Sequence, residues 1–405
     1  MPEVMTPSQA AWAHFRGSIG VRIGLAILAV LVAGAVYAPF LSSEAALLWN
    51  DGSGWTSPVL GELFNRKTYA KPYDLVFNLF AVTLPFTLAI AWWFRGTWSW
   101  PRRILLIAGV PLVAALVMVV PIPRDDGGWR SLWRGYPPES RSLSAHLADP
   151  GTVRAVFTPI GHQWDQTYAG AVLKEPGTVN AATGRPFLLG TDSRGQDVLA
   201  RMLFGGRISL TIGFVATGIA MAIGILIGAV SGYFGGWVDL LLQRIVEIMM
   251  CFPTFILILI VVSALGRDIF IIILVQGLTG WAGDARLVRG EVLVQSSRDY
   301  VLAGRALGLG RVRIMFRHIL PNCMTPLLIG AVFGIAGAVL GESGLSFIGL
   351  GDPNAPSWGQ LLNQGRENIH MSWLIWTPGL SVFALVSALY LVGNGLRAAF
   401  DPKAR

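Results

Sequence analysis

The ionisable side chains of this chain are scattered and form no arrangement typical of an enzyme. Its histidines lie far apart, without the spacing of zinc ligands; they are His14, His146, His162, His318 and His370. The sequence also lacks Gly-x-x-x-x-Gly-Lys-Ser/Thr, the loop whose backbone N–H groups hold nucleotide phosphates. We therefore expect no catalytic residue, no metal site, no cofactor bound by this chain and no ATP hydrolysis by it.

A few acidic residues in or beside apolar stretches are the remaining candidates, because an ionisable side chain in a membrane often has a function. Glu247 follows Arg244 by about one helical turn, and simple pairing of the two is the slightly favoured interpretation. Asp284 lies at the end of an apolar run. Glu342 is expected at the outer end of another run, near water, where it could line the outer mouth of a pore. Pro253 predicts a kink that could shape the pore.

The elements that must position these residues are membrane helices. Hydrophobic residues make up 53% of the 405 residues and charged residues 13%, whereas a soluble domain carries about 25% charged residues. Apolar runs of about 18 or more residues can cross the hydrocarbon core as helices. Eight spans are predicted, at residues 23–41, 75–94, 104–120, 208–230, 240–264, 269–283, 324–340 and 374–396. The predicted fold class is an all-α polytopic membrane protein.

Basic residues in the connections predict how the chain is oriented, because Lys and Arg stay on the cytoplasmic side. They are Arg95, Arg102 and Arg103 after the second span, seven arginines between Arg286 and Arg317, and Arg397, Lys403 and Arg405 after the last. An even number of spans puts all of them, and the N-terminus, in the cytoplasm. The net charge of +8 is therefore explained by topology, and we expect no nucleic-acid partner.

This orientation predicts four parts of the chain. They are an N-terminal cytoplasmic segment with the first helix at 1–41, an outside loop and a helix pair at 42–120, a large extracytoplasmic segment at 121–206, and a helical core at 207–405 with a cytoplasmic loop at 284–322. Near the start of the core, Asp192 is predicted to cap a helix that enters the bilayer. An amphipathic segment at the outer surface is the alternative for residues 191–199.

The loop at 284–322 carries the clearest functional signal. Ser297 is predicted to cap a short helix, and Gly308 or Gly310 to end it in a left-handed conformation. A second short helix, at 312–320, is expected to stop at Pro321 before the next span. A loop this long favours a docking role. A basic, solvated connection remains the alternative.

Residues 300–322 resemble the cytoplasmic loop of binding-protein-dependent ABC importer permeases. The family pattern there is Glu-Ala-Ala, three residues, Gly, and then Ile-x-Leu-Pro after a gap. The residues that fit it are Ala303, Gly308, Leu320 and Pro321. Leu302 replaces the usual Glu, and Gly304 replaces the second Ala.

Four further stretches resemble the dipeptide, oligopeptide and nickel branch of that family. They are residues 189–199, 232–239, 346–351 and 400–403. Such permeases have about six membrane helices. The second and third spans, with much of the segment before residue 189, therefore look like an insertion into this core, and we assign it no function.

The resemblance implies a permease subunit in the bacterial cytoplasmic (inner) membrane that moves small peptides or related solutes. The implied partners are a second homologous permease, cytoplasmic ATPase subunits that use ATP, an extracytoplasmic substrate-binding protein and the lipid bilayer. The residues that would dock on the ATPase are Tyr300, Leu302, Ala303, Gly304, Arg305, Ala306, Leu307, Gly308 and Pro321. Glu247, Pro253 and Glu342 are candidates for the pore or its outer mouth.

Two other function classes remain as alternatives. An ion-coupled secondary transporter would act without an ATPase, and it predicts paired charges within the membrane or broken helices in both halves of the chain. A membrane-embedded enzyme would need histidines or acids clustered at one depth, which the sequence does not show.

Overall fold

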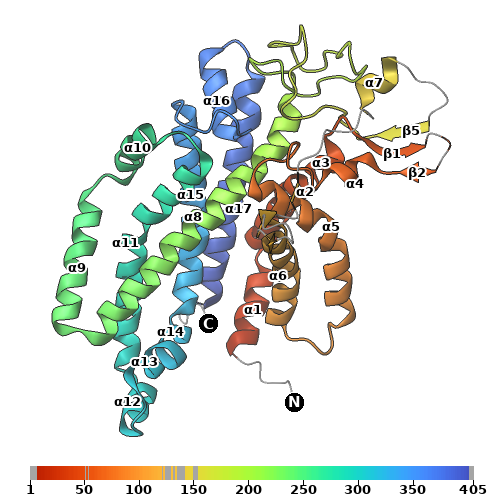
Figure 1. Ribbon diagram of the computed structural model, residues 1–405. Coiled ribbons are helices and arrows are strands. Elements are labelled where there is room, and N and C mark those ends of the chain that lie inside the picture. The colour runs from red at the N-terminus through yellow and green to blue at the C-terminus, as the bar shows by residue number, and fades with distance from the viewer. Residues whose placement is uncertain are drawn as a thin grey trace. The chain divides into compact units, whose positions relative to one another are not determined.

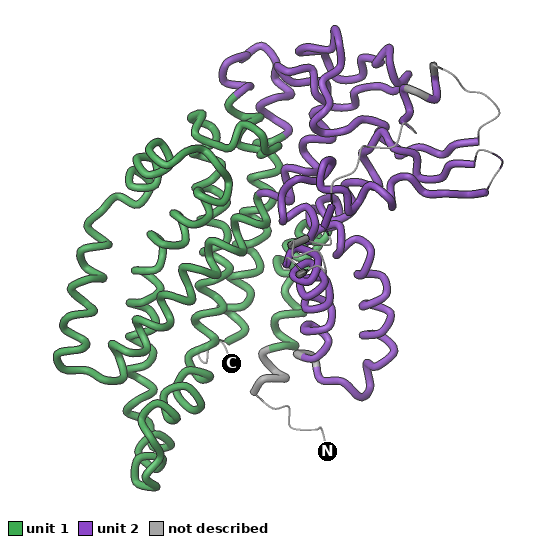
Figure 2. Tube along the Cα trace, in the orientation of Figure 1, with its two compact units in different colours: residues 1–30, 209–363, 378–405 green, residues 31–208, 364–377 purple. Residues whose placement is uncertain are grey.

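The computed structural model describes residues 7–50, 52, 54–120, 122–123, 129–130, 133–134, 142–148 and 154–400. This part of the chain is mainly helical (Figure 1). It divides into two compact units (Figure 2). Unit 1 contains residues 1–30, 209–363 and 378–405, and unit 2 contains residues 31–208 and 364–377. Residues 401–405, which include the end of the stretch at 400–403, lie outside the described residues, as do residues 121, 124–128, 131–132, 135–141 and 149–153 of the predicted outside segment.

Helices of membrane-spanning length dominate the described chain. Seven are long and apolar enough to cross a membrane. They are α2 (Ile19–Val36), α5 (Pro72–Trp93), α6 (Trp100–Val119), α8 (Val198–Phe234), α11 (Ile269–Ser296), α15 (Met324–Phe347) and α17 (Trp373–Phe400). A bent pair, α9 (Gly236–Cys251) and α10 (Thr254–Leu265), brings the number to eight if it forms one span. Each predicted span corresponds to one of these helices or to the bent pair, although several bounds differ, and the fold is confirmed as a multi-pass, mainly α-helical membrane protein.

The span predicted at 240–264 differs from the expected kinked helix, because α9 and α10 meet at an angle of 78°. Pro253 has no N–H to donate to a carbonyl of the preceding turn. Phe252 before it has an extended backbone, with φ −82° and ψ 129°, which is the conformation that a following proline favours. The helix therefore breaks at Pro253.

Helix α11 is longer than the predicted span at 269–283. The carboxylate of Asp268 caps it by accepting the N–H of Phe270 at 2.8 Å. The helix then runs through Asp284 to Ser296. Its last turns place Val288 and Val292 in the core of unit 1. The predicted loop at 284–322 therefore begins as a continuation of α11.

Glycines at every fourth position of α8 allow α11 to pack closely against it within unit 1. A Cβ at Gly228 would lie 2.7 Å from the Cβ of Val288, and one at Gly232 would lie 3.1 Å from the Cβ of Val292. Gly224 faces Ala285 in the same way, one turn earlier. Small residues at this spacing let the backbones of two membrane helices approach each other.

The two ends of the chain also pack within unit 1. Helix α1 (Pro7–Gly17) and the first half of α2 contact α17 through a cluster of Phe15, Val21, Val392 and Ala399. Gly24 of α2 lies so close to α17 that a Cβ there would be 2.9 Å from the carbonyl oxygen of Ala388.

Unit 2 contains the helix pair α5–α6 and several short elements. The short helices and strands are α3 (Ala38–Leu41), β1 (Ala46–Asn50), β2 (Trp55–Thr56), α4 (Pro58–Glu62), β3 (Ile122–Pro123), β4 (Trp129–Arg130), α7 (Leu143–Ala148) and β5 (Arg154–Phe157). Strand β1 pairs antiparallel with both β2 and β5, and β3 pairs with β4. Residues 364–377 of this unit include the end of α16 (Trp358–Glu367). These short strands are an addition to the all-α fold that the sequence predicted.

A buried ion pair joins three helices of unit 2. Arg207 of α8 is fully buried, and its Nη1 lies 3.2 Å from Oδ1 of Asp74 in α5. Its guanidinium also donates to the carbonyl oxygens of Ala35 and Val36, at 2.8 and 3.2 Å. These carbonyls form the C-terminal end of α2, where a cation is favourable. Arg207 thus connects α5 with α2 and α8.

Candidate functional site

The predicted docking loop is a helical hairpin between α11 and α15. It comprises α12 (Asp299–Ala306), α13 (Arg311–Ile314), a π-helical turn η1 (Met315–Ile319) and α14 (Leu320–Asn322). The sequence predicted that the second limb stops at Pro321, but the helical backbone continues past this residue. Pro321 lies in the first turn of α14, where its missing N–H is tolerated. The chain passes through Cys323 directly into α15.

The start of α12 differs from the prediction by one residue. Arg298 occupies the N-cap position with an extended backbone, φ −76° and ψ 149°, and no side chain caps the helix. Ser297 was expected there, but its hydroxyl donates to the carbonyl oxygen of Val294 at 2.9 Å. Ser297 therefore bonds to the end of α11 and does not begin α12. Asp299 lies in the first turn of α12, as expected for a carboxylate near a helix N-terminus.

Of the two glycines predicted to end α12, Gly308 is the one that does so. Gly308 has φ +75°, the left-handed conformation that glycine adopts without strain. Its N–H donates to Arg305 O at 3.0 Å, and the N–H of Leu309 donates to Gly304 O at 3.1 Å. These two bonds form a Schellman motif, which fixes the direction of the chain after the helix. Gly310 instead begins α13.

Helix α12 has one buried and one exposed face. Val301 is fully buried in a cluster that includes Ile314, Met315 and Ile319, and Gly304 lies on the same face. The opposite face carries exposed side chains from the predicted docking set: Leu302, Ala303, Arg305, Ala306 and Leu307. Tyr300, Gly308 and Pro321 are exposed as well. The structure thus brings together the nine predicted residues, of which Gly304 alone faces inward.

Tyr300 ties the two limbs of the hairpin to α11. Its hydroxyl donates to Oε1 of Gln295 at 2.9 Å and accepts from Nδ2 of Asn322 at 3.4 Å. Partial burial raises the pKa of Tyr300 above its usual value, so the phenol remains protonated at neutral pH. The exposed face of α12 is therefore held by hydrogen bonds as well as by the apolar cluster.

A basic hollow lies beside α12. It has a volume of about 460 Å³ and is lined by Tyr233, Phe234, Arg305, Leu309, Arg311 and Ile314. The guanidinium of Arg305 lies over the ring of Tyr233, with Cζ 5.6 Å from the ring centroid, a distance at which a cation and an aromatic face attract. The end of α8 therefore orients one of the predicted docking residues.

The candidate pore residues do not gather at one place. Glu247 is exposed on α9 and accepts from Arg244 Nη1 at 2.7 Å, in agreement with the interpretation of a simple pair. Pro253 is exposed at the break between α9 and α10.

The expectation that Glu342 lies near water is wrong, because its exposed fraction is 2%. Helix α15 continues beyond the predicted end of the span to Phe347, which leaves Glu342 inside the helix. Gly359 of α16 packs directly on Ser343 and covers this end. Ser346 Oγ donates to Glu342 Oε1 at 2.6 Å.

Unit 1 also contains a cavity of about 340 Å³ between α8, α10, α11 and α15. Its lining includes Asp284, and also Thr254 and Phe255, which directly follow the break at Pro253. The rest of the lining is mostly Gly and Ala, and it does not include Glu247, Pro253 or Glu342. This cavity depends on helices far apart in the sequence, and the sequence did not predict it.

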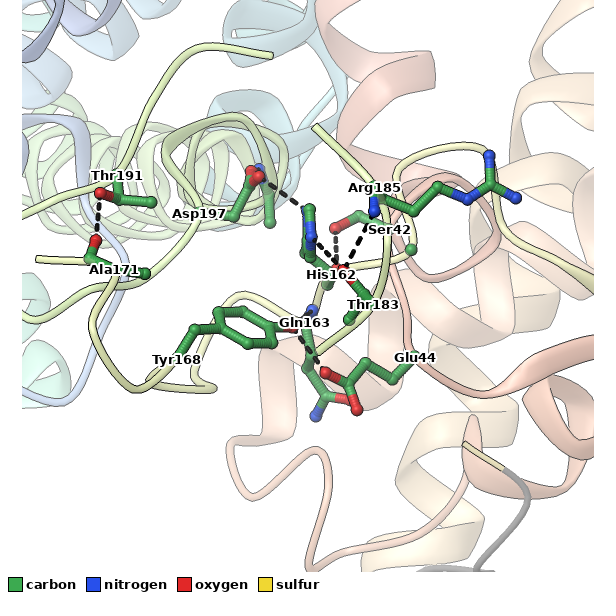
Figure 3. Close-up of polar contacts among 12 residues, drawn as sticks. Ser42, Glu44, His162, Gln163, Tyr168, Ala171, Thr183, Arg185, Thr191 and Asp197 are labelled. Carbon is green, nitrogen blue, oxygen red and sulfur yellow. Dashed lines mark hydrogen bonds and ion pairs between the residues drawn. The ribbon is translucent and has the colours of Figure 1, made fainter. Parts of the chain in front are cut away.

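Unit 2 contains a buried polar cluster that sequence reasoning missed. Figure 3 shows His162 between Asp197 and Thr183. His162 Nδ1 donates to Asp197 Oδ2 at 3.0 Å, and His162 Nε2 lies 2.9 Å from Thr183 Oγ1. The rings of Tyr168 and Phe187 contact the imidazole, with centroids at 5.2 and 4.5 Å.

The chain of hydroxyl, imidazole and carboxylate in this cluster has the composition of a nucleophilic triad, but its environment is that of a core. Thr183, His162 and Asp197 are 2%, 0% and 0% exposed, so no substrate reaches the hydroxyl. The cluster therefore serves to hold the segment before α8 together. Among the described residues, no group of histidine, cysteine and acidic side chains is placed to hold a metal ion.

The same cluster corrects the predicted start of α8. Asp197, and not Asp192, caps this helix, since its Oδ1 accepts the N–H of Ala200 at 2.7 Å. Asp192 instead organises the preceding turn by accepting the N–H groups of Arg194 and Gln196 at 2.8 and 2.9 Å, and it pairs with Arg201. The residues at 191–197 thus form a compact turn before the helix.

Comparison with known proteins adds information about relatives. The family model described as "Binding-protein-dependent transport system inner membrane component" matches residues 224–405. The dipeptide-type relatives include the di/tripeptide transport system permease protein DppC of Pseudomonas aeruginosa, 36% identical over 253 residues, which are 62% of this chain and 83% of the relative. The dipeptide transport system permease protein DppC of Haemophilus influenzae is 38% identical over 54% of this chain and 76% of the relative.

Other similarities are less complete. The peptidoglycan transport system permease protein YejE of Agrobacterium fabrum is 40% identical over 216 residues, and the match spans 53% of this chain but only 57% of that relative. A solved structure of the MetNI methionine ABC transporter in inward-facing conformations aligns with a TM-score of 0.43 and 19% identity, over 50% of this chain and 97% of that chain. A likeness at this level is too weak to carry a conclusion.

Proposed function

Since the chain belongs to the family of binding-protein-dependent transport system inner membrane components, we propose that it is the permease subunit of an ATP-driven importer of small peptides. Relatives named for dipeptides and di/tripeptides support the substrate class. The observation that carries the proposal is the hairpin after α11. Eight of the nine predicted docking residues are exposed on it, and its buried face is anchored in the core of unit 1.

The partners follow from this role. A second permease completes the pore, and cytoplasmic ATPase subunits bind the exposed face of α12. An extracytoplasmic substrate-binding protein delivers the solute. In this assembly the chain lies in the bacterial inner membrane with the hairpin in the cytoplasm, which is the side that its arginines favour.

The hairpin is suited to transmit motion because it is stiff at both ends. On one side α12 follows α11 after only Ser297 and Arg298, and on the other α14 leads directly into α15. The hydrogen bonds of Tyr300 and the Schellman motif at Gly308 prevent the short helix from moving alone. A displacement of α12 by the ATPase would therefore move α11 and α15, two helices that line the cavity, as rigid-body switching requires.

Uptake by purified components tests this function. The chain, co-purified gently from membranes with its neighbours, should carry a stoichiometric ATPase subunit, and proteoliposomes should accumulate a labelled dipeptide only with ATP. Uptake that persists without ATP but follows an ion gradient would favour the ion-coupled carrier. That alternative predicts paired charges within the membrane or broken helices in both halves. The described residues contain one bent helix pair, and the buried pair of Arg207 and Asp74 joins helices of unit 2.

A charge reversal tests the docking face. Arg305→Glu should lower peptide uptake about tenfold or more while the ATPase still turns over, because it places an acidic side chain in the contact and removes the interaction with Tyr233. Arg16→Glu is the matched control, since Arg16 is exposed and lies outside the hairpin. Normal coupling in Arg305→Glu would contradict the docking role.

A further inference from the structure

The cavity of unit 1 contains polar side chains that lack partners. Gln276 of α11 is 7% exposed, and within the described residues neither its Oε1 nor its Nε2 has a hydrogen bond. Thr217 of α8 is 8% exposed, and its Oγ1 is also unpaired there. Both side chains line the cavity, together with the carboxylate-bearing Asp284 of α11.

Glycines of α15 leave the space that these side chains occupy. A Cβ at Gly341 would lie 3.0 Å from Gln276 Nε2, and a Cβ at Gly334 would lie 2.9 Å from Thr217 Cγ2. Any larger residue at either position would displace the polar group. The fold thus keeps an amide and a hydroxyl at the wall of an otherwise small-residue cavity.

Unpaired buried polar groups need an explanation. A buried donor or acceptor without a partner costs about 1–3 kcal/mol, and most such groups in proteins are paired. Gln276 leaves both a donor and an acceptor open, which is the pattern that matches a peptide group. The cavity, at about 340 Å³, falls in the range of ligand-binding pockets.

We propose that Gln276, Thr217 and Asp284 form a site that contacts the substrate during translocation, with Gln276 bonded to a backbone amide of a short peptide and Asp284 paired with its ammonium group. The inference rests on the proposed function and specifies the residues that contact the peptide.

The distance between Gln276 and Asp284 along α11 indicates the length of peptide that could contact both. Gln276 and Asp284 lie eight positions apart on one helix, a rise of about 12 Å. An extended peptide covers about 3.3–3.6 Å per residue. The site therefore fits a peptide of about three residues, with its N-terminus toward Asp284.

Uptake by the complete transporter in proteoliposomes tests the two neutral groups. Gln276→Leu and Thr217→Val keep nearly the same volume but remove the hydrogen-bonding groups, and each should lower uptake of a tripeptide about tenfold at low concentration. Thr279→Val is the matched control, because the hydroxyl of Thr279 donates to Val275 O at 2.8 Å in its own helix. Complex assembly should be unchanged in all three variants, and Thr279→Val should keep wild-type uptake.

Wild-type uptake in the two neutral-group variants would overturn the site while leaving the importer intact. A wild-type complex that imports no peptide with ATP would instead refute the proposed function, and this inference with it.

A charge-specific measurement tests Asp284. The wild type should prefer a tripeptide with a free N-terminus over its N-acetylated form, and Asp284→Asn should reduce that preference about tenfold. An unchanged preference would show that Asp284 does not bind the ammonium group.

Cysteine protection identifies the occupant. Gln276→Cys, in a chain with Cys251→Ser and Cys323→Ser, should react with a water-soluble maleimide, and a saturating tripeptide should slow the reaction. Cross-linking of position 276 to the second permease, or failure to react in any state, would mean that another protein chain or lipid fills the cavity, and would overturn the proposal.

Discussion

Gly304 within α12 and Gly308 just after it differ in what they do, although they lie four residues apart. A Cβ at Gly304 would meet Leu309 and Ile314 at 3.5 and 3.9 Å, which are ordinary packing distances. The space around Gly304 is therefore large enough for a Cβ, and the alanine that is usual at this position of the importer permeases would fit. Gly308, with φ +75°, is in a conformation that side chains with a Cβ rarely adopt.

We expect these substitutions to have opposite effects on stability. Gly304→Ala should raise the free energy of unfolding by up to about 1 kcal/mol, because alanine favours a helix over glycine, and uptake should persist. Gly308→Ala should lower it by about 1–2 kcal/mol through left-handed strain. Thermal unfolding of the purified chain in detergent measures both, and each variant controls for the other. Equal effects would show that the Schellman motif does not decide the geometry of this helix.

At the scale of elements, close packing of α8 against α11 depends on the glycines of α8. Gly228 has almost no space, with a prospective Cβ 2.7 Å from Val288. Gly218, on the same helix, has no atom within 4 Å of such a Cβ and is exposed. A substitution at Gly228 therefore changes both helix packing and helix propensity, whereas the same substitution at Gly218 changes helix propensity alone.

Leucine at these two positions should give different results. Gly228→Leu should destabilise the chain by about 3 kcal/mol or more, since overpacking must push the helices apart, whereas Gly218→Leu should be neutral or slightly stabilising. Size-exclusion chromatography after a heating series measures the fraction that stays folded. Similar melting of both variants would argue against the helix contact.

The break between α9 and α10 is a second feature of the elements that bears on function. Thr254 and Phe255, the first two residues of α10 after this break, line the cavity. That Pro253 shapes the pore stays a prediction, since Pro253 itself does not line this cavity.

At the scale of the molecule, the buried pair of Arg207 and Asp74 integrates the helix pair α5–α6, which looks like an insertion, into unit 2. Removing one partner leaves the other charge buried and unpaired, which is far more costly than losing an exposed pair. Arg207 also bonds the carbonyls at the end of α2. The additional helices are therefore attached to elements of the predicted permease core.

We expect Asp74→Leu to destabilise the chain by about 3–5 kcal/mol, and the double change with Arg207→Met to recover part of that loss. Arg244→Gln, which breaks the exposed pair with Glu247, should cost about 1 kcal/mol or less. Thermal unfolding of the four variants, including Arg207→Met alone, gives the coupling energy. Strict additivity would mean that the two side chains do not interact.

The sequence by itself determined the class of the molecule, because crossing a bilayer requires long apolar runs that are visible in one dimension. Local chemistry also limited the left-handed end of α12 to Gly308 or Gly310, of which Gly308 has the left-handed backbone, and it predicted a kink at Pro253, where the structure has a sharper break. Helix starts were less accurate: Ser297 and Asp192 have the residue types of caps, but Arg298, one residue later, and Asp197, five residues later, occupy those positions.

Only the tertiary structure decided which polar residues meet. Asp74 and Arg207 are 133 positions apart, and His162 and Asp197 are 35 apart, so no local pattern marks them as pairs. Glu342 is buried because α16 returns over the end of α15. Gln276, Thr217 and Asp284 line one cavity, in which glycines of α15 leave room for Gln276 and Thr217. Packing between distant segments, which sequence periodicity does not encode, determines each of these arrangements.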